Sequence, residues 1–272
     1  MDVLPRMKIA VCMSGQLRNW EIAKKNQYWF WSSAGVEVDY FIHTWNYSGD
    51  RKGVSQPYEW RKVDVSEFNK IVKHYGCRKS IFDTKPQLFF YNNDHWSSLF
   101  YSFAQSVMLK RQYEIENNFE YDLVVKTRPD VAFNPKIIFT CRPREDNIVY
   151  STHGGNMENE FHMFNLNDCV FSSSSYTMDL LSNVYSFRQK LINEKSGCNL
   201  SNFYPKFLEH LGPGIIIAEY CRNYGITPLV TMGNVHSYLE TLIKLGCPEN
   251  LDLMNKEEFE IMDKYFRDWY LN

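Results

Sequence analysis

The sequence predicts an α/β protein in which helices flank one mostly parallel β-sheet. Three observations lead to this class. Short apolar runs typical of buried strands alternate with longer segments typical of helices. The clearest apolar runs end in polar turns, as strands do in open parallel sheets. The chain has 272 residues, 44% of them hydrophobic, and no internal repeat or linker divides it, so we expect one domain over residues 1–272.

The first expected elements have the order of a βαβ unit. Residues 8–13 form a compact apolar run, and residues 14–19 follow it as a polar turn that contains a glycine. Residues 20–31 favour a helix, and residues 38–43 favour a second strand that ends in polar and aromatic side chains. This order predicts two neighbouring parallel strands joined by a helix.

A loop, two helices and a short strand are expected next. Residues 48–56 are rich in glycine, serine and charge, which indicates a surface loop. Residues 65–75 carry an apolar face at helical spacing, and residues 80–82 favour a short strand. Residues 98–118 have the strongest helical pattern, with apolar side chains on one side and charged ones mostly on the other. That helix leads directly into the next apolar strand.

This next strand, at residues 123–125, runs into an Arg-Pro-Asp sequence. Pro129 cannot donate to a sheet ladder and biases Arg128 towards an extended conformation, so we expect the strand to end near Thr127. In open α/β sheets, ligands bind just beyond the carboxyl ends of the strands. Arg128 and Asp130 therefore stand where a phosphate and a metal ion could be held. The alternative is a salt bridge at the end of a strand.

The second half of the chain predicts further strands and helices. A serine run at residues 172–175 precedes a helix that Ser175 would cap, and a Gly-Pro-Gly segment precedes another helix. The expected elements are strands at residues 147–151 and 227–232, and helices at residues 176–191, at 215–224 and from 255 onward.

Composition limits the classes of partner and of location. The formal charge of −2 and the pI of about 6.4 give no polyanion-binding surface, so we expect no nucleic-acid partner. No run has the length of a membrane span, and the apolar run near the start is too short for a signal peptide. Seven cysteines occur without any Cys-x-x-Cys pair, which fits free thiols and predicts a cytoplasmic protein.

The first polar turn is a candidate anion site. Residues 14–18 have neither the glycines of a dinucleotide-binding fingerprint nor the Gly-Lys-Ser/Thr element of a phosphate loop. Backbone N–H groups at the start of a helix attract anions, and Arg18 could add a charge-assisted contact to a phosphate. The alternative is an ordinary turn with a surface arginine.

Carboxylates and histidines supply candidates for a metal and for a general base. Mg²⁺ and Mn²⁺ favour one or two carboxylates together with phosphate oxygens and waters, which suits Asp130, with His236 or else His153 as a second ligand. Asp168 and Glu160 could accept a proton from a hydroxyl nucleophile. The alternatives are structural or surface histidines, and a turn or helix cap at Asp168.

Taken in order, several motifs resemble a known family. They are the first strand with Ser-Gly-Gln-Leu-Arg, then Val-Asp-Tyr-Phe-Ile-His-Thr-Trp-Asn, then Tyr-Asp-Leu-Val-Val-Lys-Thr-Arg-Pro-Asp, and then Asn-Asp at residues 167–168. Over residues 8–185 the chain resembles GT-A-like glycosyltransferases of bacterial surface-polysaccharide clusters and large DNA viruses. The resemblance implies a Rossmann-like sheet that binds a nucleotide sugar, usually with Mn²⁺ or Mg²⁺, and transfers the sugar to the hydroxyl of a saccharide or glycoconjugate acceptor. It also implies a nucleotide-binding half, residues 1–135, and an acceptor-side half, residues 136–272.

The resemblance implies a role for each candidate residue. Enzymes of this kind carry an Asp-x-Asp element for the metal, and here Arg128 replaces the first carboxylate, so the arginine could itself neutralise the departing diphosphate. Related sequences have Pro-Glu where this chain has Pro213 and Gly214, which removes a carboxylate that would serve the acceptor. The implied donor residues are Ser14, Gly15, Gln16, Arg18, His43, Thr44 and Arg128, the metal ligands Asp130 and His236, and the general base Asp168 or Glu160.

Two rival functions remain open at the level of sequence. The first is a catalytically silent nucleotide- or glycan-binding domain of the same fold, suggested by the two departures from the family pattern. The second is a nucleotidyltransferase, whose similar sheet binds a nucleoside triphosphate and a metal. The first turn lacks the glycine-rich, lysine-containing sequence that such an enzyme would use.

Overall fold

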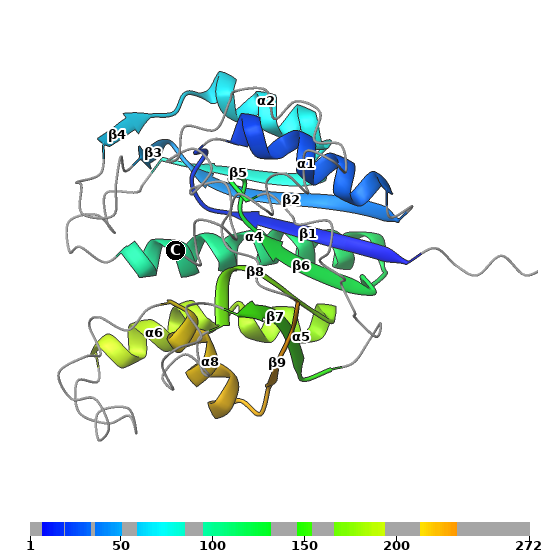
Figure 1. Cartoon of the computed structure of the whole chain (residues 1–272), viewed down its shortest axis with the longest axis vertical. Coiled ribbons are helices and arrows are strands. Elements are labelled where there is room, and N and C mark those ends of the chain that lie inside the picture. The colour runs from blue at the N-terminus through cyan, green and yellow to red at the C-terminus, as the bar shows by residue number, and fades with distance from the viewer. Residues whose placement is uncertain are drawn as a thin grey trace, which may run out of the picture.

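A computed structural model describes residues 7–18, 20–33, 36–50, 59–84, 95–131, 146–153, 166–193 and 213–232. These residues form a seven-stranded sheet with helices on both faces, beside a two-stranded ribbon (Figure 1). The α/β class with a mostly parallel sheet is thereby confirmed.

Strands from both halves of the chain build the large sheet. Its order is β5-β2-β1-β6-β8-β7-β9, and β3 pairs with β4 in the separate ribbon. The pairs β1·β2, β1·β6, β2·β5 and β7·β9 are parallel, whereas β8 is antiparallel to both of its neighbours. The strands are β1 (Lys8–Ser14), β2 (Glu37–Trp45), β3 (Tyr47–Asp50), β4 (Glu59–Lys62), β5 (Lys79–Asp83), β6 (Leu123–Thr127), β7 (Ile148–His153), β8 (Leu166–Ser173) and β9 (Thr227–Met232).

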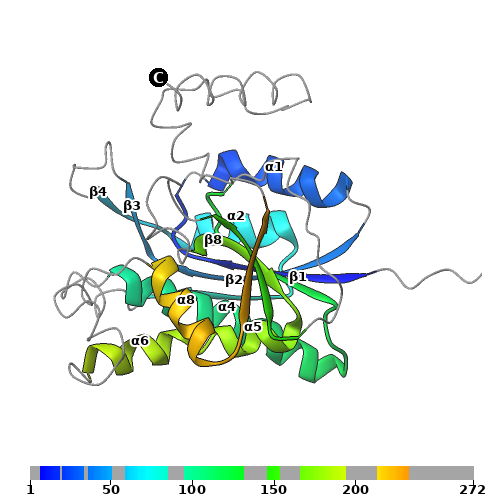
Figure 2. The same ribbon diagram turned by 60° about the horizontal axis from the view of Figure 1, so that its bottom comes forward.

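Helices cover the two faces of the sheet unequally. In Figure 2, α1 and α2 lie on one face, and α4, α5, α6 and α8 lie on the other. The helices are α1 (Trp20–Ser33), α2 (Val65–Tyr75), α4 (His95–Asn117), α5 (Ser175–Leu181), α6 (Val184–Asn193) and α8 (Pro213–Asn223). None of these helices is long and apolar enough to cross a membrane.

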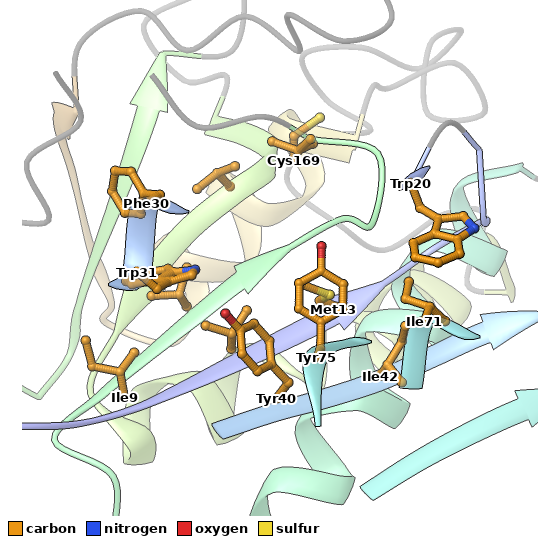
Figure 3. Close-up of a cluster of buried hydrophobic side chains, with 14 of the residues drawn as sticks. Ile9, Met13, Trp20, Phe30, Trp31, Tyr40, Ile42, Ile71, Tyr75 and Cys169 are labelled. Atoms are coloured by element: carbon orange, nitrogen blue, oxygen red, sulfur yellow. The ribbon is translucent and has the colours of Figure 1, made fainter. Parts of the chain in front are cut away.

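Two hydrophobic cores follow from the alternation of side chains along the buried strands. Ile9, Val11 and Met13 of β1 pack towards α1 and α2, while Ala10 and Cys12 pack towards α4. Figure 3 shows the core beneath α1 and α2, where the ring centroids of Tyr40 and Tyr75 lie 4.8 Å apart.

Helix α2 illustrates how local sequence sets its own limits. The Asp64 carboxylate accepts a hydrogen bond from the N–H of Glu67 and caps the first turn. Gly76 adopts a left-handed conformation, with φ of 59°, and donates its N–H to the last turn. Polar caps at both ends and a buried face of Phe68, Ile71 and Tyr75 place the helix at residues 65–75, as predicted.

Three expectations need correction. The segment 176–191 is not one helix, because a turn at Ser182 and Asn183 separates α5 from α6. The cap of α5 is Ser174, whose hydroxyl accepts from the N–H of Thr177, and not Ser175. The expected surface loop at 48–56 begins as strand β3. The expected helix from 255 onward lies outside the described residues, and the division into two functional halves stays a prediction.

Candidate functional site

The carboxyl ends of β1, β2 and β6 meet at one edge of the sheet because the three strands are parallel neighbours. In register, Ser14 lies beside His43, and Met13 lies beside Thr127. The turn after β1 and the turn after β6 therefore start side by side. Gly15 has φ of 127°, which favours glycine, and a Cβ there would lie 3.9 Å from Cγ of Arg128.

The Arg-Pro-Asp sequence forms a tight turn that two helices hold in place. The N–H of Val131 donates to the carbonyl oxygen of Arg128 at 3.3 Å and closes the turn. Gln27 of α1, which is fully buried, donates through Nε2 to the carbonyl oxygens of Arg128 (3.0 Å) and Val131 (2.5 Å). The hydroxyl of Tyr75 of α2 donates to Oε1 of Gln27 at 3.2 Å. These contacts fix the direction in which Arg128 and Asp130 leave the backbone.

Asp130 is held by two arginines. Arg128 donates to it through Nε (2.8 Å to Oδ1) and through Nη2 (2.5 Å to Oδ2). Nε of Arg18 lies 3.3 Å from the same Oδ2. Burial favours the neutral carboxyl, but the two guanidinium groups outweigh burial and hold the pKa of Asp130 below its usual value. Asp130 is therefore ionised at neutral pH, with both oxygens already engaged. We call Arg18, Asp130 and Arg128 the arginine–aspartate cluster.

Asp130, the predicted metal ligand, is paired with two arginines, and its role in binding a divalent cation stays a prediction. Both carboxylate oxygens accept from guanidinium groups, and two positive charges next to the carboxylate repel a further cation. Within the described ranges, no three His, Cys, Asp or Glu side chains gather in a way that could hold a metal ion. His236, the second expected ligand, lies outside those ranges, so its metal-binding role stays a prediction.

The turn after β1 is held by the β3–β4 ribbon. Oε1 of Gln16 accepts the N–H of Gly49 at 2.7 Å, and Nη1 of Arg18 lies 3.5 Å from the carbonyl oxygen of Gly49. Nη2 of Arg61 in β4 donates to the carbonyl oxygen of Leu17 at 2.9 Å. The side chains of Gln16 and Arg18, predicted as donor-binding residues, therefore also anchor the ribbon, which the sequence did not predict.

His43 supports the turn after β1 through Ser102. The N–H of Gly15 donates to Oγ of Ser102 in α4 at 2.9 Å, and that oxygen lies 2.8 Å from Nδ1 of His43. Nε2 of His43 lies 3.7 Å from Oδ2 of Asp83. Burial lowers the pKa of His43, and the nearby Asp83 only partly offsets that effect. Neutral His43 thus orients Ser102, which orients Gly15. Ser102 and Asp83 were missed because nothing in a helical or strand pattern marks them.

Strand β8, the antiparallel neighbour of β6, carries Asp168, the predicted general base. Because β8 is antiparallel to β6, Cys169 lies beside Arg128, with 3.5 Å between Sγ and Nη1. The ammonium of Lys126, 1% exposed, donates to the carbonyl oxygen of Asp168. Burial lowers the pKa of Lys126, and Asp168 partly opposes the shift. Burial and Asp168 raise the pKa of Cys169 to about 11. Lys126 and Cys169 had no sequence signal, and Glu160 lies outside the described residues.

Several buried oxygens near this edge have no hydrogen-bond partner among the described residues. Thr44, Asn46 and Ser48 occupy alternate positions from the end of β2 into β3, and Ser14 and Thr127 end β1 and β6. A buried polar group without a partner costs about 1–3 kcal/mol. A polar ligand at this edge would supply the missing partners.

Comparison of the chain with models of known protein families and with curated proteins gives no match. The functional argument therefore rests on the residues at this edge of the sheet.

Proposed function

We propose that this protein is a GT-A-like glycosyltransferase that moves a sugar from a nucleotide-sugar donor to a hydroxyl of a saccharide or glycoconjugate acceptor. The observation that carries the proposal is the arginine–aspartate cluster at the carboxyl edge of a mostly parallel sheet. Ligands of open α/β sheets bind at this edge, and guanidinium groups pair well with phosphate oxygens.

The cluster would act on the leaving group. Glycosyl transfer develops positive character on the sugar while negative charge grows on the departing nucleoside diphosphate. Arg18 and Arg128 would stabilise that negative charge. The turn at Ser14 and Gly15 would receive the nucleotide, and the unpartnered oxygen of Thr44 would bind one of its polar groups.

Asp168 would serve the acceptor. In an inverting transfer, the acceptor oxygen bonds to the anomeric carbon, the bond from that carbon to the diphosphate oxygen breaks, and a base takes the hydroxyl proton. In support, Oδ1 of Asp168 lies 4.0 Å from Sγ of Cys169, and that sulfur lies 3.5 Å from Nη1 of Arg128. The free thiols of Cys12, Cys77 and Cys221 support a cytoplasmic setting for this reaction.

The test is consumption of nucleotide sugars. The protein would be incubated with UDP-, GDP- and CMP-sugars, with and without Mn²⁺ and simple saccharide acceptors, and released nucleotide would be quantified by chromatography. We expect one donor class to be consumed, and Arg128→Gln to slow its consumption by about 100-fold or more. Arg222→Gln is the matched control, because Arg222 lies on α8, its side chain is 64% exposed, and it pairs with Glu219 of the same helix.

The second candidate is the silent binding domain, which the same experiment separates. The observation that favours it is that Asp130 is neutralised by its arginines, leaving no carboxylate there for chemistry. Donor binding by thermal shift without consumption of any donor would support the silent domain. Absence of both binding and consumption would overturn the glycosyltransferase proposal.

A further inference from the structure

We propose that the arginine–aspartate cluster binds a diphosphate group directly, without a divalent cation, and that Asp130 is a positioning residue for the two arginines. The inference rests on the proposed function for the nature of its ligand, a nucleoside diphosphate. The site itself can be probed with inorganic pyrophosphate.

The first argument is the geometry around Asp130. Arg128 meets the carboxylate at two points, Nε at 2.8 Å from Oδ1 and Nη2 at 2.5 Å from Oδ2, which is the two-point pairing that guanidinium and carboxylate groups favour. Arg18 adds a third contact to Oδ2. A metal ion on this carboxylate would lie beside both positive charges. The carboxylate serves to align the arginines.

The second argument is which charges reach the surface. The side chain of Asp130 is 3% exposed, whereas those of Arg18 and Arg128 are 15% and 14% exposed. An arriving ligand therefore meets the two arginine side chains and almost none of the carboxylate. Such a surface attracts an anion and gives a cation little to bind.

The third argument is the balance of charge. Two arginines against one aspartate leave one positive charge in the cluster. A diphosphate carries the complementary negative charge.

The fourth argument is that the site is already assembled. Gln27 and Tyr75 fix the turn that carries Arg128 and Asp130, and Gly49 of the ribbon lies against Arg18. The cluster needs no added metal to bring its arginines together, since Asp130 does so.

The experiment measures anion binding by calorimetry in EDTA and, separately, in Mn²⁺. Inorganic pyrophosphate would be tested in EDTA, and UDP and GDP in both conditions. We expect pyrophosphate to bind in EDTA, and the dissociation constant of the bound nucleotide to change less than about 3-fold between EDTA and Mn²⁺. Arg18→Gln and Arg128→Gln should each weaken binding in EDTA by roughly 10-fold or more, and Arg222→Gln should leave it unchanged.

Asp130→Asn separates a positioning role from a metal-ligand role. A positioning Asp130 predicts weaker pyrophosphate binding in EDTA, measured well below the thermal midpoint of the variant. A metal-ligand Asp130 predicts a loss confined to Mn²⁺, and a merely structural one predicts a lower midpoint with unchanged affinity. Either of these results would overturn the positioning role. If Asp130→Asn does not fold, Arg128→Lys carries the test, since it keeps the charge, loses the paired contact, and should also weaken binding in EDTA.

The two proposals can fail separately. Nucleotide binding that occurs only with Mn²⁺ would overturn the metal-free site and leave the glycosyltransferase standing. Pyrophosphate binding in EDTA without consumption of any nucleotide sugar would keep the site and overturn the transferase. Failure of pyrophosphate and both nucleotides to bind in either condition would overturn the metal-free site.

Discussion

His43 is a buried residue that supports the turn after β1 without facing solvent. Its ring is fully buried and contacts Ser102, and Ser102 accepts the N–H of Gly15. The sequence placed His43 among the donor-binding residues, and the structure places it one side chain behind the turn. Whether it also contacts the donor stays a prediction.

The buried imidazole predicts a specific dependence of stability on pH. Burial lowers the pKa of His43 in the folded state, so below about pH 6.5 the unfolded chain binds a proton that the folded chain does not. His43 therefore costs stability as the pH falls below that value. His43→Asn keeps a polar atom near the position of Nδ1 and removes the titration. The free energy of unfolding of the variant, measured with urea, should fall less steeply from about pH 7.5 to 5.5. If the free energy of unfolding of the two proteins changed in parallel with pH, this role of His43 would be contradicted. His74, whose pKa is also lowered by burial, contributes equally to both proteins and does not affect the comparison.

The β3–β4 ribbon packs against the turn after β1 through hydrogen bonds of Gly49 and Arg61. It depends on a close contact, because a Cβ on Gly49 would lie 2.6 Å from the ring of Trp60. Only glycine allows the ring to lie there without movement. Since Gly49 also binds Gln16 and Arg18, this packing is linked to the candidate anion site.

Gly49→Ala should therefore disturb the ribbon and the site together. Trp60 is 42% exposed and its ring can shift, so we expect a loss of no more than about 1 kcal/mol of unfolding free energy, together with weaker pyrophosphate binding because Arg18 loses its support. Trp60→Ala supplies the control. In that background the added methyl group meets no ring, so the further cost of Gly49→Ala should largely vanish. An equal cost in both backgrounds would show that the ring contact is not the cause.

At the scale of the whole molecule, a buried ionic network joins α4 to the second half of the chain. The ammonium of Lys110, fully buried, lies 2.8 Å from Oε2 of Glu114 and 2.7 Å from Oδ1 of Asp179, and donates to Oγ of Ser175 at 2.5 Å. Burial raises the pKa of Asp179, and Lys110 opposes this effect. The network links α5 to α4 on the face of the sheet opposite α1.

Lys110→Met should be strongly destabilising. It leaves two poorly exposed carboxylates without their shared cation, which costs about 3 kcal/mol of unfolding free energy at neutral pH. The deficit should shrink as the pH falls and Asp179, whose pKa burial raises, takes up a proton. Arg111→Gln is the control: Arg111 lies 3.8 Å from the same Asp179 but is 65% exposed, so its loss should cost less than about 1 kcal/mol. Urea unfolding of both variants measures the difference, and equal costs would contradict the argument.

The sequence by itself determined what depends on neighbouring residues. Alternating apolar runs and helical patterns established the α/β class. The apolar face of residues 65–75 predicted α2, and Pro129 predicted the end of β6 near Thr127. These signals suffice because capping, turns and the burial of one helix face are settled within a few residues.

Only the tertiary structure decided which distant groups meet. Arg18 reaches Asp130, Ser102 reaches Gly15, and Cys169 reaches Arg128 because parallel and antiparallel strands place them together. No local pattern encodes these partners. That is why the sequence could propose Asp130 as a metal ligand while the fold gives its carboxylate to two arginines.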